Sequence, residues 1–191
     1  MLSLKLMNHF FCYLLLISSL NNSVGETSSI KSDMSIIFEE DNQVKGALFL
    51  GNKKAAMNST ELKKQGVNAV VTVAGEFEIS YNGSDILHKV YPALDRGDYD
   101  LSIYFEDSFN FIEEALKNGS VLVHCSGEIS RSATIVIAYL MKKNNWKVDK
   151  TYTFVKKKIF IHPNPGFIKQ LRSYQSKLEI YRESKVRKDE F

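Results

Sequence analysis

The chain is poor in the residue types that mark several special classes of protein. Of its 191 residues, only three are proline and two are cysteine. It contains no internal repeat and no low-complexity segment, which excludes a repeat array or a biased linker. The formal net charge of +3 is too small to indicate a nucleic acid or a membrane surface as a partner.

What remains is the composition of an ordinary globular protein. Hydrophobic residues make up 44% of the sequence and charged residues 25%. A chain of this length can form one domain with a real hydrophobic core. Basic residues gather late in the sequence, and such runs are most often solvated helix faces. They are Lys156, Lys157, Lys158, Arg182, Lys185, Arg187 and Lys188.

Residues 1–25 have the layout of a secretory signal peptide. Lys5 gives the start a positive charge, and an almost unbroken apolar run follows over residues 10–20. The small residues Ser23 and Gly25 then occupy the −3 and −1 positions of a cleavage site. The apolar run is too short to span a bilayer comfortably, so we expect no stable membrane insertion.

The other end of the chain carries a second targeting signal. Lys188–Phe191 reads Lys-Asp-Glu-Phe, which resembles the Lys-Asp-Glu-Leu retrieval address with its last residue changed. The two ends together predict a protein of the endoplasmic reticulum lumen or secretory pathway. The alternative is a cytoplasmic chain that starts at Met34, with residues 182–191 as a basic, solvated tail.

Cysteine usage fits either compartment. Because Cys12 lies in the predicted signal peptide, a processed chain would keep Cys125 alone and would have no intramolecular disulfide. Glycosylation sequons begin at Asn58, Asn82 and Asn118. A chain this rich in asparagine contains one or two sequons by chance, so they add little.

After a linker over residues 26–34, the pattern predicts an α/β fold. Strands are expected at residues 36–38, 47–50, 67–74, 87–91 and 120–124. Helices are expected from Asn58 to Gly66, from Asp100 to Gly119, and over residues 132–144, 148–161 and 164–183. The helix after Asp100 has one wide apolar stripe, made of Ile103, Tyr104, Phe105, Phe109, Ile112 and Leu116. Strands that alternate with helices predict a sandwich with its functional loops at one sheet edge.

The strongest functional signal is the segment over residues 121–132, Val-Leu-Val-His-Cys-Ser-Gly-Glu-Ile-Ser-Arg-Ser. An apolar strand delivers Cys125, and an apolar helix begins next to Arg131. The backbone N–H groups of a tight loop at a helix N-terminus attract an anion, and Arg131 adds a planar fork that matches two phosphoryl oxygens. These positive groups also favour the thiolate, which is the nucleophilic form of cysteine. The segment predicts a cysteine nucleophile in a phosphate-binding loop.

Neighbouring residues have supporting roles in this prediction. His124 is expected to orient the backbone of Cys125, and Ser132 to donate a hydrogen bond to the sulfur when it leaves. A Cys and an Arg six positions apart form a weak pattern alone, but a buried inert thiol would need neither Arg131 nor the helix start. Substrate is expected to bind along Ser126, Gly127, Glu128, Ile129, Ser130 and Arg131.

Five further segments raise the specificity of the pattern. They are Leu-Phe-Leu-Gly-Asn at 48–52, Gly-Val-Asn-Ala-Val-Val at 66–71, Ala-Leu-Asp at 93–95, Asp-Leu-Ser-Ile-Tyr-Phe at 100–105 and Pro-Asn-Pro-Gly-Phe-Ile-Lys-Gln-Leu at 163–171. With the cysteine loop, they resemble the dual-specificity branch of the protein tyrosine phosphatase family over residues 35–181. The resemblance implies a single-domain sandwich with a central mixed sheet of about five strands flanked by helices.

The resemblance also supplies a general acid, Asp95. A leaving alkoxide or phenoxide needs a proton, and a carboxylic acid on a loop opposite the cradle can deliver it. Asp98 and Asp100 lie close in sequence, but Asp98 is better explained as a solvated charge and Asp100 as a helix cap. The implied reaction passes through a phosphocysteine on Cys125 and needs neither metal nor cofactor.

One residue of the loop departs from the family pattern. The family has glycine three residues after the cysteine, where this chain has Glu128, and the glycine stands one place earlier at Gly127. A non-glycine residue in a strained loop costs on the order of 1–3 kcal/mol, and a carboxylate beside the cradle repels a phosphate dianion. A side chain that points to solvent would be largely screened. The alternative to an active enzyme is therefore a pseudophosphatase that binds phosphoproteins.

The resemblance implies a phosphorylated protein as the substrate. The domain is short and has no added elements to deepen a phosphotyrosine-only pocket, so both phosphotyrosine and phosphoserine or phosphothreonine are expected to fit. Ser126, Gly127, Ile129 and Ser130 bring no extra cation, which argues against highly charged inositol phosphates. A monomer is expected, with no nucleic acid partner.

Overall fold

Five strands form one mixed sheet in the computed structural model, which describes residues 33–39, 46–127 and 129–189. In chain order the strands are β1 (Met34–Glu39), β2 (Ala47–Gly51), β3 (Val67–Val73), β4 (Leu87–Tyr91) and β5 (Ser120–His124). Their order across the sheet is β1-β2-β5-β3-β4. Only the β1–β2 pair is antiparallel among these strands. The predicted α/β class and five-stranded mixed sheet are confirmed.

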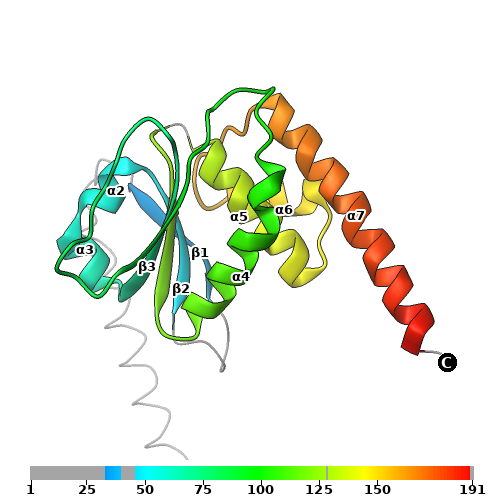
Figure 1. Ribbon diagram of the computed structural model, residues 1–191, viewed down its shortest axis with the longest axis horizontal. Coiled ribbons are helices and arrows are strands. Elements are labelled where there is room, and N and C mark those ends of the chain that lie inside the picture. The colour runs from blue at the N-terminus through cyan, green and yellow to red at the C-terminus, as the bar shows by residue number, and fades with distance from the viewer. Residues whose placement is uncertain (1–32, 40–45, 128, 190–191) are drawn as a thin grey trace, which may run out of the picture. The chain divides into compact units, whose positions relative to one another are not determined.

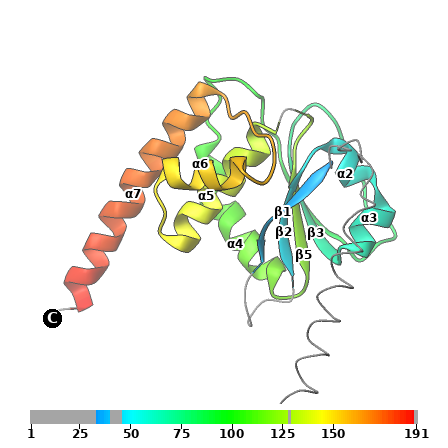
Figure 2. The same cartoon turned by 180° about the vertical axis from the view of Figure 1, so that it is seen from behind.

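Helices cover both faces of the sheet (Figures 1 and 2). The two short helices α2 (Lys53–Met57) and α3 (Ser59–Lys64) lie on one face. The other face carries the 3₁₀ turn η1 (Ser102–Tyr104) and the helices α4 (Phe105–Leu116), α5 (Arg131–Asn144), α6 (Val148–Lys156) and α7 (Pro165–Asp189). Parallel strands need such crossover helices, which explains why β2, β5 and β3 are buried between two layers, whereas the edge strand β4 stays partly exposed.

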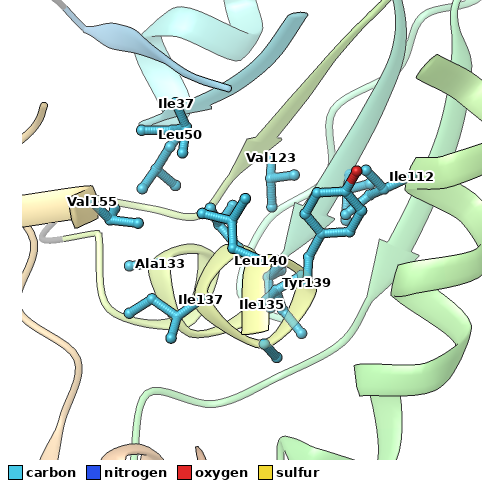
Figure 3. Packing of buried hydrophobic residues seen from close by; sticks show 14 of the residues in the cluster. Ile37, Leu50, Ile112, Val123, Ala133, Ile135, Ile137, Tyr139, Leu140 and Val155 are labelled. Atoms are coloured by element: carbon cyan, nitrogen blue, oxygen red, sulfur yellow. The ribbon is translucent and has the colours of Figure 1, made fainter. Parts of the chain in front are cut away.

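The larger hydrophobic core is built around α5, and Figure 3 shows 14 of the residues in this core. Every residue of α5 from Arg131 to Met141 is buried. Ile135, Ile137 and Leu140 are each 0% exposed, because the helix is packed between the sheet and helices α4, α6 and α7. A helix that is apolar all round is expected to lie in such a place. The first turn of α5, which carries Arg131 and Ser132, is therefore held on a rigid support.

Several predicted elements differ from the structure in detail. Asn58 caps α3 as predicted, and its Oδ1 accepts from the N–H of Glu61 at 3.1 Å. Helix α2 was not predicted, because five residues give too short a periodic pattern. The prediction that Asp100 caps the helix is wrong: its Oδ1 accepts from the N–H of Ser102 at 3.0 Å, but Leu101 is the N-cap of η1 and Tyr104 that of α4. Ile103 does not belong to the buried stripe and is 61% exposed.

The ends of two helices also differ from the predicted ends. Helix α6 ends at Lys156 rather than at residue 161, and α7 continues through residues 184–189. The predicted signal peptide, Glu128, and Glu190 and Phe191 of the C-terminal motif lie outside the described residues. Within the described ranges, no helix has both the length and the apolar character that crossing a membrane requires.

Candidate active site

Cys125 follows the last residue of β5, at the carboxyl edge of the sheet. It is 1% exposed, and the hydroxyl of Ser132 donates to its Sγ at 3.2 Å. Ser132 lies in the first turn of α5, so the strand end and the helix start meet at the sulfur. The structure thus brings these two predicted site residues together.

The guanidinium of Arg131 is buried beneath the same loop and is almost fully engaged. Its Nη1 donates to Oε2 of Glu76 at 2.7 Å and to the carbonyl of Ala93 at 2.9 Å. Its Nη2 donates to Oε1 of Glu76 at 2.7 Å and to Oγ of Ser126 at 2.9 Å. Among the described residues, no group accepts from its buried Nε. One edge of the fork therefore keeps an unused donor.

Glu76 was not predicted as a site residue. It follows the carboxyl end of β3, and it accepts from Ser126 and from the N–H of Gly75 as well as from Arg131. Hydrogen bonds from Arg131 lower the pKa of Glu76 to about 2, against the opposing effect of burial. Burial is the largest single effect on Arg131 and disfavours its charge, but the bonds to Glu76 and the charge interactions with Cys125, Glu76 and Asp95 together outweigh it and raise the pKa of Arg131. The two groups form a charged pair at neutral pH.

Asp95, the predicted general acid, lies at the free edge of Arg131. Its Oδ2 is 3.7 Å from Nε of Arg131. Its Oδ1 accepts from Ser130 Oγ and from Asn164 Nδ2, both at 2.8 Å. Two segments distant in sequence from Asp95, residues 130–131 and Asn164, thus hold its carboxylate beside the cysteine loop. Asn164 belongs to a predicted motif, but its role as a holder of Asp95 was not predicted.

The neighbouring acids Asp98 and Asp100 are engaged away from the cysteine loop. Asp98 forms an exposed ion pair with Arg96, with Oδ2 2.6 Å from Nη2. Asp100 bonds the N–H and the hydroxyl of Ser102. Neither of these two acids contacts Arg131, so Asp95 is the acid that the loop presents to the site.

His124 supports the cysteine from behind, as predicted. Its Nδ1 lies 3.3 Å from the carbonyl oxygen of Cys125, and its Nε2 lies 2.8 Å from Oγ1 of Thr72. The residue is fully buried, and burial lowers the pKa of His124 to about 4. The ring is therefore neutral at physiological pH.

The described part of the loop between Cys125 and Arg131 contains a strained residue, Ile129. Ile129 has a φ of 45°, which is unusual for a β-branched residue and carries strain. Its side chain is 7% exposed within the main core, and its carbonyl accepts from the N–H of His162 at 3.4 Å. By contrast, a Cβ added at Gly127 would meet nothing within 4 Å. The burial of the Ile129 side chain and the bond to its carbonyl therefore hold this end of the loop, whereas nothing packs against the Cβ position of Gly127.

A separate cavity of 720 Å³ lies among η1, α4 and α7. Its lining includes Lys142, Lys169 and Tyr174, and it contains none of Cys125, Arg131 or Asp95. Within the described ranges, no group of three or more His, Cys, Asp or Glu residues is arranged to hold a metal ion. The residues with reactive chemistry meet instead at the cysteine loop.

Comparison with known proteins shows the family of this chain. The family model for the dual specificity phosphatase catalytic domain matches residues 48–177, more than half of the chain. The chain belongs to the dual specificity phosphatase family. Dual specificity protein phosphatase 1B of Arabidopsis thaliana is 37% identical over 139 residues, which cover 72% of this chain and 83% of that protein.

Solved structures of this family have the same fold. A mouse dual specificity phosphatase, described as putative and complexed with zinc tungstate, has a TM-score of 0.72 at 26% identity. The match covers 84% of this chain and 97% of that one. Human DUSP28 has a TM-score of 0.70 at 27% identity, with 80% of this chain and 99% of that one covered. Family and fold together support protein phosphatase activity.

Proposed function

We propose that this chain hydrolyses phosphotyrosine and phosphoserine or phosphothreonine in proteins through a cysteinyl-phosphate intermediate. The observation that carries the proposal is the unused Nε donor of Arg131, which lies buried between the cysteine loop and Asp95. A buried donor without an acceptor is costly, and a phosphoryl oxygen would satisfy it. Cys125 and Asp95 are the nucleophile and the acid that such a phosphoryl group would meet.

In the first step, the thiolate of Cys125 attacks phosphorus and the bond to the leaving oxygen breaks. Asp95 donates its proton to that oxygen, so the substrate leaves as an alcohol or a phenol. Arg131 and the loop N–H groups hold the charge that develops on the other phosphoryl oxygens. One P–S bond forms, one P–O bond breaks, and the proton from Asp95 neutralises the departing oxygen.

In the second step, water attacks the phosphocysteine. Asp95, now a carboxylate, accepts a proton from the water, and the sulfur leaves as a thiolate. The hydroxyl of Ser132, 3.2 Å from Sγ, stabilises that departing charge with a hydrogen bond. The chain returns to its starting state with Asp95 protonated.

The test is turnover by the purified chain on an aryl phosphate and on matched phosphotyrosine and phosphothreonine peptides. We expect phosphate release from all three, and none from Cys125→Ser. Release from the phosphotyrosine peptide alone would contradict dual specificity. An inactive wild type that becomes active as Glu128→Gly would favour a phosphoprotein-binding role.

Where the chain acts is a separate proposal, the endoplasmic reticulum lumen or secretory pathway. It is supported by the sequence of residues 1–25, and the sequon residues Asn58, Asn82 and Asn118 are all exposed. Glycosylation at Asn58 or Asn82 of the full chain expressed in cells, removed by an endoglycosidase, is the expected result. An unmodified chain that starts at Met34 would contradict it.

A further inference from the structure

Three side chains behind Cys125 form a hydrogen-bonded chain that the reaction steps above do not use. Oγ1 of Thr72 lies 2.8 Å from Nε2 of His88 and 2.8 Å from Nε2 of His124. The other ring nitrogen of His124 lies 3.3 Å from the carbonyl oxygen of Cys125. The three residues come from the neighbouring strands β4, β3 and β5, and Thr72 and His124 are register partners.

The hydrogens of this chain have one consistent arrangement. A carbonyl oxygen can only accept, so Nδ1 of His124 must carry the proton that bonds Cys125. Since burial keeps the ring of His124 neutral at pH 7, its Nε2 has no proton and must accept. Thr72 has one hydroxyl hydrogen and gives it to His124. Its oxygen then accepts from Nε2–H of His88, and this donor remains whether His88 is neutral or charged.

The surroundings leave His124 and Thr72 no competing partner among the described residues. Thr72 is 1% exposed and His124 is 0% exposed. The rings packed on the two histidines belong to Phe77, 6.2 Å from the ring of His124, and to Tyr81, 4.9 Å from that of His88. The hydroxyl of Tyr81 is occupied, because it donates to the carbonyl of Ala56 at 2.9 Å. In this relay of His88, Thr72 and His124, the last two residues are enclosed and His88 is partly buried, and the direction of the hydrogen bonds is fixed.

We propose that Thr72 and His88 are positioning residues that fix the Nδ1–H tautomer of His124 and so hold the Cys125 carbonyl in place. With the other tautomer, lone pairs of Nδ1 and of the carbonyl oxygen would face each other and push the start of the loop away. The peptide planes after Cys125 would then turn, and their N–H groups would no longer converge on a phosphoryl group. This inference rests on the proposed function for its kinetic effect, but the tautomer itself does not depend on turnover.

Two pairs of variants distinguish the effect of the hydrogen bonds made by Thr72 and His88 from the effect of side-chain shape. Thr72→Val keeps the shape and removes the hydroxyl, whereas Thr72→Ser keeps the hydroxyl. His88→Phe removes the donor, whereas His88→Gln offers an amide N–H near the position of Nε2. We expect kcat to fall about tenfold in Thr72→Val with KM within about twofold, and Thr72→Ser to recover most of the loss.

The tautomer is measured by ¹⁵N NMR of the histidine rings in the full chain at pH 7. The expected result is a protonated Nδ1 and an unprotonated Nε2 for His124, a preference that is lost in Thr72→Val and kept in Thr72→Ser. A wild-type proton on Nε2, or a Thr72→Val chain with unchanged tautomer and unchanged kcat, would overturn the proposal. If Thr72→Val does not fold, as judged by circular dichroism, the His88→Phe and His88→Gln pair gives the same comparison.

Alkylation of Cys125 provides a readout that needs no phosphatase activity. In a Cys12→Ser background, Cys125 is the one thiol of the chain. Its rate of reaction with iodoacetamide is expected to change in Thr72→Val and to return to the wild-type rate in Thr72→Ser. If the wild type hydrolyses no phosphate ester but the alkylation rate still changes in Thr72→Val and returns in Thr72→Ser, the result would contradict the proposed function and support the relay. Equal rates in all variants would contradict the relay.

Discussion

The carboxylate of Glu76 accepts two hydrogen bonds from the end of the Arg131 guanidinium, with one oxygen 2.7 Å from each Nη atom. Such a bidentate pair fixes both the position and the plane of the fork. The edge that remains, at Nε, lies 3.7 Å from Asp95. The pair therefore leaves the Nε of Arg131 without a hydrogen-bond acceptor among the described residues, while it neutralises part of the charge of Arg131.

Glu76→Ala is expected to lower kcat/KM for an aryl phosphate by about 10- to 100-fold, since the buried fork would lose two of its acceptors and its fixed plane. Initial rates measure the effect, and Glu78→Ala is the matched control because Glu78 is an exposed acid two positions on. A more active Glu76→Ala chain would instead mean that the carboxylate competes with the phosphate.

The same pair makes the stability of the fold depend on acid pH. The pKa of Glu76 is lowered from 4.5 to about 2 in the folded chain, so the unfolded chain binds more protons between these values. The stability that Glu76 contributes is complete above pH 4.5 and is lost as the pH falls toward 2. In urea titrations over this range, Glu76→Gln should show a flatter dependence of the free energy of unfolding on pH than the wild type or Glu78→Gln. Equal slopes would contradict the ion pair.

Asp95→Asn tests the general acid. The amide cannot donate a proton to the leaving oxygen, so we expect kcat to fall by about 10²–10⁴-fold. The loss should be larger for phenyl phosphate, a poor leaving group, than for p-nitrophenyl phosphate. Asp98→Asn is the control, because Asp98 pairs only with the exposed Arg96 in the described contacts. An equal loss for both substrates would assign Asp95 a binding role.

The Asp95 loop and the start of α7 approach each other closely at Gly97 and Gly166. A Cβ added at Gly166 would lie 2.0 Å from the carbonyl oxygen of Gly97, whereas a Cβ added at Gly97 would meet nothing closer than 3.7 Å. Gly166→Ala must therefore displace the loop of Asp95 or the segment of Asn164, which bonds it. We expect Gly166→Ala to lower both kcat and the melting temperature, and Gly97→Ala to change activity little. Similar effects of the two variants would argue against this close approach.

The sequence predicts the residues whose position follows from one local segment. Cys125, Arg131, Ser132 and His124 lie within nine positions, and a strand, a loop and a helix start bring them together. Asp95 came from the family resemblance. Glu76 carries no local motif, because a single exposed acid after a strand looks like any solvated charge. Its only signal is that it follows β3, whose carboxyl end lies beside that of β5 in a parallel pair.

The Thr72–His88 relay was hidden for a related reason. Strand order across the sheet is not local information, so the sequence could not show that β3 lies between β4 and β5. The predicted end of α6 was wrong at residues 157–161. There the chain leaves the helix at Lys156 and runs to the cysteine loop, where the N–H of His162 bonds the carbonyl of Ile129. Ile103 was misplaced because a 3₁₀ turn changes the phase of the apolar stripe.

In the proposed reaction the phosphoryl group is bonded to Cys125 between the two steps, and intact mass spectrometry after acid quench can detect that intermediate. Ser132→Ala should slow the departure of the sulfur, so that variant is expected to accumulate one phosphoryl group per chain after mixing with an aryl phosphate. Peptide mapping should place the group on Cys125, and Cys125→Ser should carry none. Phosphate release by the wild type with no phosphocysteine in either the wild type or Ser132→Ala would contradict the account.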